Sequence, residues 1–230
     1  MKRALLASAG AAAAAAFLVP MATADHRPGH KPNPPNPNLS IGAQPNPVLW
    51  GRAITISGRL RGNDNDSKTM TLQQNPHPFK GAFRSVATTT TDAQGDYSFG
   101  GIRPLSHTQY RVRADLNPDE TSANEVVLVR KKIGRRVDDR TPDRGDRVTF
   151  SGRVTPAHDG DTIQLQRRRA SGSWRTFANV TLEDAGPTRP NSSVYRHRIR
   201  IFRDGAWRAR IKADEDHLGN RSRRVRINVE

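Results

Sequence analysis

The chain has 230 residues, of which 38 are Lys or Arg and 22 are Asp or Glu, so its formal net charge is +16, and it contains no cysteine. Without cysteine there is no disulfide bond, no thiol nucleophile and no lipid-modified cysteine. The positive charge is concentrated in the second half, because residues 25–129 carry 11 basic and 9 acidic side chains whereas residues 130–230 carry 25 and 13.

The first 24 residues have the pattern of a Sec-type signal peptide. Lys2 and Arg3 supply the charged start, residues 4–19 form an Ala-rich apolar segment, and Ala-Thr-Ala at 22–24 supplies the cleavage site. The apolar segment is shorter than the roughly 20 residues that a membrane-spanning helix needs. We therefore expect cleavage before Asp25, and a mature chain that is secreted or held in the cell envelope and has no membrane span.

Residues 25–38 follow as a linker rich in proline and asparagine. Prolines at short intervals favour the extended polyproline II conformation, which acts as a semi-rigid spacer. We expect no packed domain in this segment.

The rest of the chain repeats itself, as residues 39–130 and residues 131–230, which we call the first repeat and the second repeat. The segment Gly-Arg-Ala-Ile-Thr-Ile-Ser-Gly-Arg-Leu at 51–60 recurs as Gly-Asp-Arg-Val-Thr-Phe-Ser-Gly-Arg-Val at 145–154, an offset of 94 residues. Three further matches are 70–73 with 163–166, 81–87 with 172–178, and 110–115 with 209–214. Most of these segments alternate apolar and polar residues, which is the period of a β-strand. The pattern indicates a tandem duplication.

Each repeat is predicted to be an immunoglobulin-like β-sandwich. A unit of roughly 95 residues with about seven short strands between turn signals has the size of that fold. The predicted fold class is all-β, with two tandem sandwiches after the signal peptide and the Pro-rich linker. The expected core positions are Ile54, Ile56, Met70, Leu72, Phe83, Tyr97, Phe99, Tyr110 and Val112 in the first repeat, and Val148, Phe150, Ile163, Leu165, Trp174, Phe177, Tyr195, Ile199, Trp207 and Ile211 in the second.

The most specific motifs of the second repeat lie in its strands and turns. They are Ser-Gly-Arg-Val-Thr-Pro at 151–156, Leu-Gln-Arg-Arg at 165–168, Gly-Ser-Trp-Arg at 172–175 and Arg-Ile-Lys-Ala-Asp at 210–214. Together they resemble Ig-like or prealbumin-like repeat domains of secreted actinobacterial proteins, and the resemblance covers nearly all of the mature chain. It implies a bacterial spacer, adhesion or carbohydrate-proximal module. It brings no catalytic residues, so we expect no enzyme activity and no cofactor.

Residues 194–213 carry the strongest candidate for a binding surface. Apolar and cationic side chains alternate on both sides of Arg-Asp-Gly at 203–205, which fits a three-residue hairpin loop with glycine in the left-handed conformation. Pairing Ile201 with Trp207 across this hairpin places six cations on the face away from the core, in opposed pairs. The pairs are Arg200 with Arg208, Arg198 with Arg210, and Arg196 with Lys212. Opposed like charges destabilise a sheet by a few tenths to about 1 kcal/mol per pair, so this face needs an anion.

The predicted cationic hairpin indicates a function. Guanidinium groups match the geometry of phosphate and carboxylate. We therefore predict that the second repeat binds an anionic polymer outside the cell, such as teichoic acid, acidic polysaccharide or extracellular DNA. The predicted polyanion-binding residues are Arg196, Arg198, Arg200, Arg208, Arg210 and Lys212, with the basic runs at 167–169 and 221–226 as candidates to extend the surface. The alternative is a purely structural spacer or protein-interaction module that has no polymer ligand.

No other motif predicts chemistry strongly. The loops 63–67 and 214–216 carry oxygen ligands at close spacing but lack the glycine and the distant glutamate of an EF-hand, so we interpret them as turns and assign no metal. The chain has no HExxH, GxSxG or Walker-type sequence. His197 alternates with the arginines and is expected to pack in the core rather than to act as a base.

Overall fold

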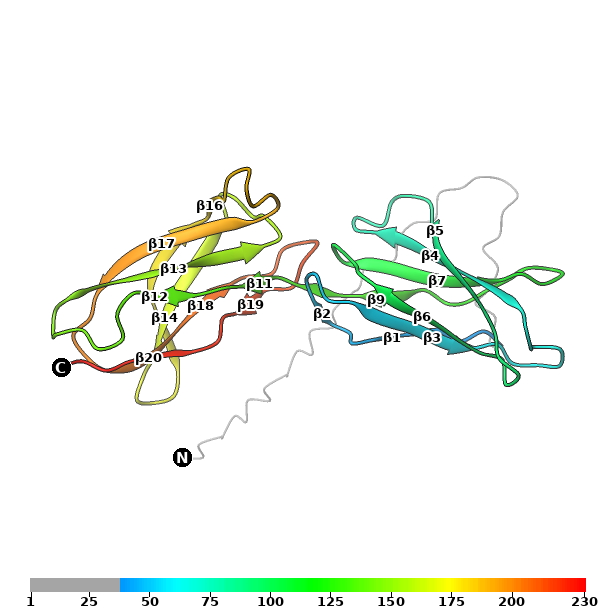
Figure 1. Ribbon diagram of the computed structural model, residues 1–230, viewed down its shortest axis with the longest axis horizontal. Helices are drawn as coiled ribbons and strands as arrows, with labels where there is room; N and C mark the ends of the chain where they lie inside the picture. Colours follow the sequence, from blue (N-terminus) through cyan, green and yellow to red (C-terminus); the bar gives the residue numbers. More distant parts are fainter. Residues whose placement is uncertain (1–37) are drawn as a thin grey trace, which may run out of the picture. The chain divides into compact units, whose positions relative to one another are not determined.

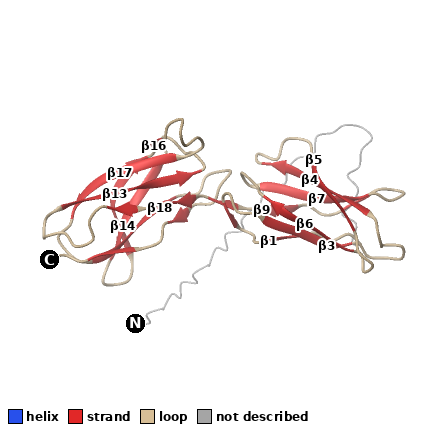
Figure 2. Cartoon of the chain, viewed as in Figure 1, coloured by secondary structure: helices blue, strands red, loops and turns tan. Residues whose placement is uncertain are grey.

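The computed structural model describes residues 38–230. The regular secondary structure in this range consists of β-strands alone (Figure 1, Figure 2). This confirms the all-β prediction. The predicted signal peptide, and the predicted linker apart from Asn38, lie outside the described residues. Nothing in the described part of the chain forms a helix with the length and apolarity needed to cross a membrane.

The first repeat consists of two β-sheets and one short parallel pair. Its strands are β1 (Gly42–Gln44), β2 (Val48–Leu49), β3 (Ile54–Arg59), β4 (Thr69–Pro76), β5 (Arg84–Thr90), β6 (Asp96–Ile102), β7 (Thr108–Ala114), β8 (Glu120–Thr121), β9 (Glu125–Val127) and β10 (Val129–Arg130). One sheet has the order β1–β3–β6, and the other has the order β5–β4–β7–β8 with β9 also paired to β7. β2 and β10 form the parallel pair.

The second repeat also consists of two sheets. Its strands are β11 (Lys132–Ile133), β12 (Arg136–Val137), β13 (Arg147–Thr155), β14 (Thr162–Arg168), β15 (Trp174–Thr181), β16 (Glu183–Asp184), β17 (Ser193–Arg200), β18 (Gly205–Ile211), β19 (Asn220–Arg221) and β20 (Val225–Ile227). The β17 sheet has the order β11–β13–β17–β16, with β12 also paired to β13. The β18 sheet has the order β15–β14–β18–β19, with β20 also paired to β18.

The two repeats use the same strand pairing. In the first, β3 pairs with β6 while β4 pairs with β5 and β7; in the second, β13 pairs with β17 while β14 pairs with β15 and β18. The chain therefore passes between two antiparallel sheets in the same order in both repeats. This arrangement is an immunoglobulin-like β-sandwich, as predicted.

Each repeat buries a hydrophobic core of its own. Residues such as Ile56 and Leu72 form the first core, and Leu165, Trp207 and Ile227 belong to the second. The alternation of the strands places one face of each sheet against this core, because successive side chains on a strand point to opposite sides. The core prediction is wrong for Phe177, whose side chain is 41% exposed. It is also wrong for Phe83 and Trp174, which are half-buried and belong to neither core.

The predicted core position of His197 is also wrong. The side chain shares a face of β17 with buried Tyr195 and half-buried Ile199, yet it is exposed. An imidazole gains little from burial unless its nitrogens find hydrogen-bond partners, and the described residues provide none for His197.

The hairpin predicted over 194–213 is wrong, because β17 and β18 belong to different sheets. A strand has two edges. β17 pairs with β13 along its whole length and with β16 at Ser193 and Val194, while β18 pairs with β14 on one side and with β19 and β20 on the other, so neither strand pairs with the other. The chain between them starts at buried Ile201, whose N–H donates to the carbonyl of Asp146. Residues 201–204 therefore cross from one sheet to the other instead of closing a tight turn.

The sequence match that begins at Tyr110 is two residues out of register with the structure. Val112 and Ala209 occupy equivalent positions, because the backbone N–H of each donates to a serine hydroxyl. The acceptors are Ser122 Oγ at 2.9 Å and Ser222 Oγ at 3.0 Å. An even shift keeps the inward and outward alternation of a strand, so periodicity alone does not detect this error.

Candidate cationic face and anion pocket

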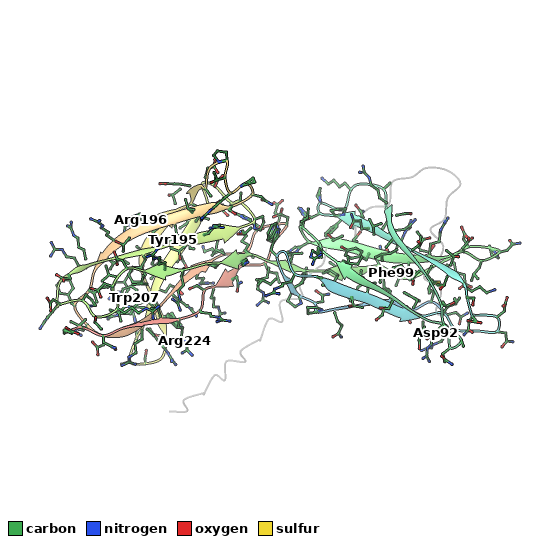
Figure 3. All side chains as sticks on the ribbon, in the orientation of Figure 1. Asp92, Phe99, Tyr195, Arg196, Trp207 and Arg224 are labelled. Atoms are coloured by element: carbon green, nitrogen blue, oxygen red, sulfur yellow. The ribbon has the colours of Figure 1, made fainter. Side chains whose placement is uncertain are left out.

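The six cations predicted to share one face lie on two sheets. Arg196, Arg198 and Arg200 are on β17, Arg208 and Arg210 are on β18, and Lys212 follows the end of β18. The two sheets pack with their inner faces together, so their outer faces point in opposite directions. Figure 3 shows Arg196 on β17 and Trp207 on β18. The single six-residue face is therefore wrong, because the three β17 arginines are on a different sheet from Arg208 and Arg210.

Arg208 belongs to a group of side chains that occurs in both repeats. Its Nε donates to Gln166 Oε1 at 2.9 Å, and its guanidinium carbon lies 3.9 Å from the centre of the Trp174 ring. The corresponding distances in the first repeat are 2.8 Å and 4.1 Å, for Arg111 with Gln73 and with the Phe83 ring. Because the weakly charged first repeat keeps this group, we assign it to the stability of the sheet rather than to a ligand.

A cationic face of different composition lies on the β17 sheet. Arg196, Arg198 and Arg200 alternate along the outer side of β17, and the register with β13 places Arg147 directly opposite Arg200. On β13, Ser151 is opposite Arg196 of β17 on one side and opposite Arg136 of β12 on the other. We call the resulting set the cationic face: Arg136, Arg147, Arg196, Arg198 and Arg200.

The cationic face is exposed and has no counter-charge. All five side chains are exposed, and none forms an ion pair with a carboxylate of residues 38–230. Opposed like charges such as Arg147 and Arg200 destabilise a sheet by up to about 1 kcal/mol. A bound anion removes this repulsion.

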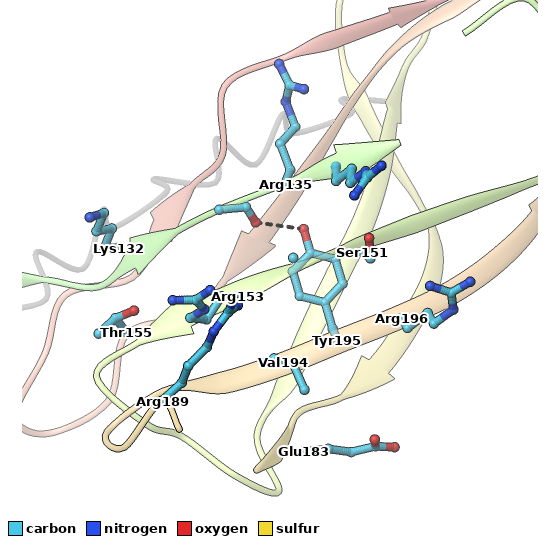
Figure 4. Close-up of a pocket in the computed structure, with 13 residues that line it drawn as sticks. Lys132, Arg135, Ser151, Arg153, Thr155, Glu183, Arg189, Val194, Tyr195 and Arg196 are labelled. Carbon is cyan, nitrogen blue, oxygen red and sulfur yellow. Dashed lines mark hydrogen bonds between the residues drawn. The ribbon is translucent and has the colours of Figure 1, made fainter. Parts of the chain in front are cut away.

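A pocket of about 570 Å³ adjoins the cationic face (Figure 4). Its lining comes from β11, β12, β13, β16, β17, the two residues between β11 and β12, and the loop between β16 and β17. The charged lining residues are the cations Lys132, Arg135, Arg136, Arg153, Arg189 and Arg196, and the single carboxylate Glu183. Arg136 and Arg196 belong to both the pocket and the cationic face, so the two form one continuous surface.

Arg135 is held by the backbone and is not free to bind. Its Nε donates to the carbonyl of Arg223 at 2.6 Å, and its Nη2 donates to the carbonyl of Arg224 at 2.5 Å. Burial lowers the pKa of Arg135, and the nearby charge of Arg140 lowers it further. We interpret Arg135 as part of the pocket wall.

Arg153 differs from the equivalent arginine of the first repeat because its side chain has no ion-pair or hydrogen-bond partner within residues 38–230. Arg59 is opposite Asp96 on the neighbouring strand and forms two hydrogen bonds to its carboxylate, of 2.5 Å from Nε and 2.6 Å from Nη2. Arg153 is instead opposite Val194. Its Nε is buried and has no hydrogen-bond partner among the described residues. The second repeat has kept the guanidinium and lacks the carboxylate.

The wall of the pocket is fixed by a close backbone approach. The Tyr195 hydroxyl donates to the carbonyl of Gly134 at 3.0 Å (Figure 4), and burial raises the pKa of Tyr195, so the hydroxyl keeps its proton. Gly152 lies against the same carbonyl, and a Cβ at this position would overlap it. The first repeat has the same arrangement at Tyr97 and Gly58.

One other cluster of ionisable side chains deserves a chemical interpretation. Its members are His158, Asp214, Asp216 and His217, whose potential ligand atoms all lie within 4.8 Å of one another. Lys131, whose side chain is 1% exposed, donates to Asp214 Oδ2, and His158 Nε2 is 2.9 Å from the same oxygen. Because an ammonium group already neutralises Asp214, we interpret the cluster as an ion-pair network rather than a metal centre.

The Lys131–Asp214 pair makes the second repeat sensitive to acid. Burial raises the pKa of Asp214, but hydrogen bonds, led by that from Lys131, outweigh burial and hold the pKa well below its ordinary value of 3.8. A carboxyl whose pKa is lowered on folding stabilises the folded state above its ordinary pKa, and this contribution is lost as the pH falls. We therefore expect the difference in Tm between the wild-type chain and Asp214→Asn to shrink below about pH 4. Calorimetry of both proteins above and below about pH 4 measures this difference in Tm. A difference that does not vary with pH would contradict the assignment.

The alternation of apolar and polar residues along a single strand does not identify Arg147 or Arg153 as site residues. For Arg153 the sequence does contain a signal, because aligning Asp-Tyr-Ser-Phe at 96–99 with Val-Tyr-Arg-His at 194–197 shows that the carboxylate is lost. Arg147 is recognised only when the register between β13 and β17 is known.

No protein-family model matches the chain, and no curated protein matches it. Among solved structures, the ectodomain of a teleost fish polymeric Ig receptor is 12% identical, with a TM-score of 0.33, over 79% of this chain and 93% of that chain. A tetra-tandem repeat in the extending region of a large adhesion protein is 14% identical, with a TM-score of 0.33, over 84% of this chain and 49% of that chain. Red sea bream transglutaminase is 12% identical, with a TM-score of 0.40, over 84% of this chain and 31% of that chain.

The chain thus spans about half of the adhesion-protein fragment and about a third of the transglutaminase. At these identities the likeness concerns the fold alone. Strand pairing and core together define the class of this protein, which is an all-β chain of immunoglobulin-like sandwiches.

Proposed function

We propose that this chain is an exported, non-catalytic binding protein whose second repeat holds an anionic polymer of the cell envelope or matrix. The observation that carries the proposal is the cationic face, five exposed arginines on one sheet without an ion pair to any described carboxylate. This surface replaces the six-residue hairpin surface predicted from the sequence, of which it keeps Arg196, Arg198 and Arg200.

The spacing of the arginines suits a polymer better than a single small anion. Alternate residues of a strand are about 7 Å apart, and neighbouring strands are about 5 Å apart. A rigid sheet therefore presents its guanidinium groups as a two-dimensional array. A chain with one negative charge per unit contacts several of them at once, and each contact releases counterions.

The first repeat provides an internal comparison. The position of Arg196 is occupied there by Ser98, since both are opposite equivalent serines, Ser151 and Ser57. Residues 25–129 carry a net charge of 11 − 9, or +2, against 25 − 13, or +12, for residues 130–230. We therefore assign polymer binding to the second repeat and the role of a spacer to the first.

Replacing Arg196, Arg198 and Arg200 by glutamine in the mature chain is expected to weaken binding to duplex DNA or to a polyuronate at least about 30-fold. If all five arginines contact phosphate, the logarithm of the affinity for DNA falls with the logarithm of salt with a slope of about 4.5, and the triple variant lowers this slope to about 2. Fluorescence anisotropy at several salt concentrations measures both quantities.

The matched control removes the same charge from the opposite sheet, by Arg210→Gln, Arg221→Gln and Arg226→Gln. These positions are on the outer side of the β18 sheet. The control should bind within about threefold of the wild-type chain. If both triple variants lose affinity equally, net charge rather than the cationic face is responsible. If the wild-type chain binds no polyanion at low salt, the structural-spacer alternative holds.

A further inference from the structure

We propose that the pocket beside the cationic face binds a carboxylate of the ligand at Arg153, in the position that Asp96 occupies in the first repeat. The ligand is then a polysaccharide that carries carboxylate groups, of the uronate class, rather than a phosphate polymer. This inference rests on the proposed function and adds the chemical class of the ligand.

The first repeat shows what an arginine at the position of Arg153 binds. Arg59 and Arg153 follow equivalent glycines, Gly58 and Gly152, each of which is opposite a tyrosine on the paired strand. In the first repeat the guanidinium takes a carboxylate through Nε and Nη2, at 2.5 Å and 2.6 Å. The local frame of Arg153 is therefore one in which a carboxylate fits with both oxygens.

The Arg153 side chain has a buried hydrogen-bond donor that lacks an acceptor. Its Nε is buried and has no partner among the described residues. Buried N–H groups in native proteins are nearly always hydrogen-bonded, and an orphaned one destabilises the folded state. A ligand oxygen at this nitrogen removes that penalty, so binding energy is gained at this position that an exposed arginine does not provide.

The space left by the missing carboxylate is open and walled by apolar and hydroxyl groups. Val194 replaces Asp96 opposite Arg153 and lines the pocket (Figure 4). Ser151 and Thr155 add hydroxyl groups to the lining. At about 570 Å³ the pocket is within the usual range of small-ligand sites, about 300–1,000 Å³, so a sugar unit fits while its neighbours extend over the cationic face.

The charges around the pocket favour an anion. Lys132 and Arg189 have no ion pair with a carboxylate of residues 38–230, and Figure 4 shows Arg189 extending from its loop toward Arg153. Glu183 is the one carboxylate of the lining. The strand order β13–β17–β16 places Glu183 on the far side of Val194 from Arg153.

The experiment restores the missing carboxylate within the protein. In the mature chain, Val194→Asp puts an internal carboxylate opposite Arg153, as in the first repeat. We expect it to lower the affinity for a galacturonate oligomer at least about tenfold in titration calorimetry, and to leave the affinity for duplex DNA within about threefold. Arg153→Gln should give the same loss for the oligomer. The methyl ester of the oligomer should bind the wild-type chain at least about tenfold more weakly than the free acid.

The control is Asn179→Asp, which adds the same charge at an exposed position of β15 on the other sheet and should change neither affinity by more than about twofold. The Tm separates a blocked pocket from a damaged fold, because Val194→Asp should raise it if Arg153 gains its partner. Oligomer binding that is unchanged by Val194→Asp, or equal for acid and methyl ester, overturns the inference. If DNA binds through the cationic face and the oligomer does not bind, the carboxylate inference fails and the proposed function stands; if neither binds, both fail.

Discussion

Replacing Asp214 by alanine is expected to destabilise the second repeat by about 3 kcal/mol. The Lys131 side chain is 1% exposed, and its ammonium donates to Asp214 Oδ2 and to the carbonyl of Lys212 at 3.3 Å. Removing the carboxylate leaves a buried charge without its main partner, which costs more than the pair itself contributes. Asp161 Oδ2, at 3.6 Å, offers only partial compensation.

Removing the charge of Lys131, instead of that of Asp214, should have a smaller effect on stability. Lys131→Met removes the buried charge and keeps most of the volume, and replacing a buried ion pair by apolar groups is often neutral or stabilising. We expect a change within about 1 kcal/mol, since Asp214, at 30% exposure, is then hydrated by water. Urea unfolding of both variants, followed by tryptophan fluorescence, compares them. Equal destabilisation would show that the packing of the Lys131 side chain matters more than its charge.

Gly152→Ala is expected to destabilise the second repeat by about 3 kcal/mol or more, because a backbone carbonyl has little room to move. The added Cβ would overlap the carbonyl oxygen of Gly134 and approach the Tyr195 hydroxyl to 2.6 Å. The same overlap exists in the first repeat, where a Cβ on Gly58 meets the carbonyl of Ser40. Gly58→Ala should therefore destabilise the first repeat in the same way.

Matched controls are available in each repeat. A Cβ on Gly100 meets nothing within 4 Å, and a Cβ on Gly134 makes only ordinary contacts of 3.7 Å. Gly100→Ala and Gly134→Ala should change the free energy of unfolding by less than about 1 kcal/mol. Thermal unfolding by calorimetry tests all four variants. If Gly152→Ala is as stable as Gly134→Ala, the strands are able to separate locally, and the pocket wall is less rigid than proposed.

Much of the fold follows from periodicity within single segments. The alternation at 51–60 and its recurrence at 145–154 predict one strand in each repeat and the duplication, and both strands exist as β3 and β13. The prediction fails where a choice of partner is required. The turn at 203–205 is compatible with a hairpin, but β18 instead pairs with β14, some 40 residues earlier in the chain. The propensity of a short turn is weak compared with the burial gained by covering both sheets.

The candidate site likewise contains residues that the sequence predicts and residues that only strand pairing reveals. Alternation correctly indicates that Arg196, Arg198 and Arg200 share a face, since residues two apart on a strand point to the same side. It does not indicate that Arg147 lies opposite Arg200, because that depends on register between strands about 50 residues apart. The replacement of Asp96 by Val194 is visible in the sequence, but its consequence appears only when Arg153 is found on the neighbouring strand.

The sequence by itself determined that this protein is built of two similar all-β units, that the second is strongly basic, and which arginines alternate with core residues. Only the tertiary structure decided which strands became neighbours. It therefore decided that five arginines form a face on the β17 sheet, beside a pocket whose Arg153 has no partner in the part of the chain that the structure describes. The physical reason is that side-chain direction is a local property of an extended backbone, whereas the partner at each strand edge is selected by packing across the whole repeat.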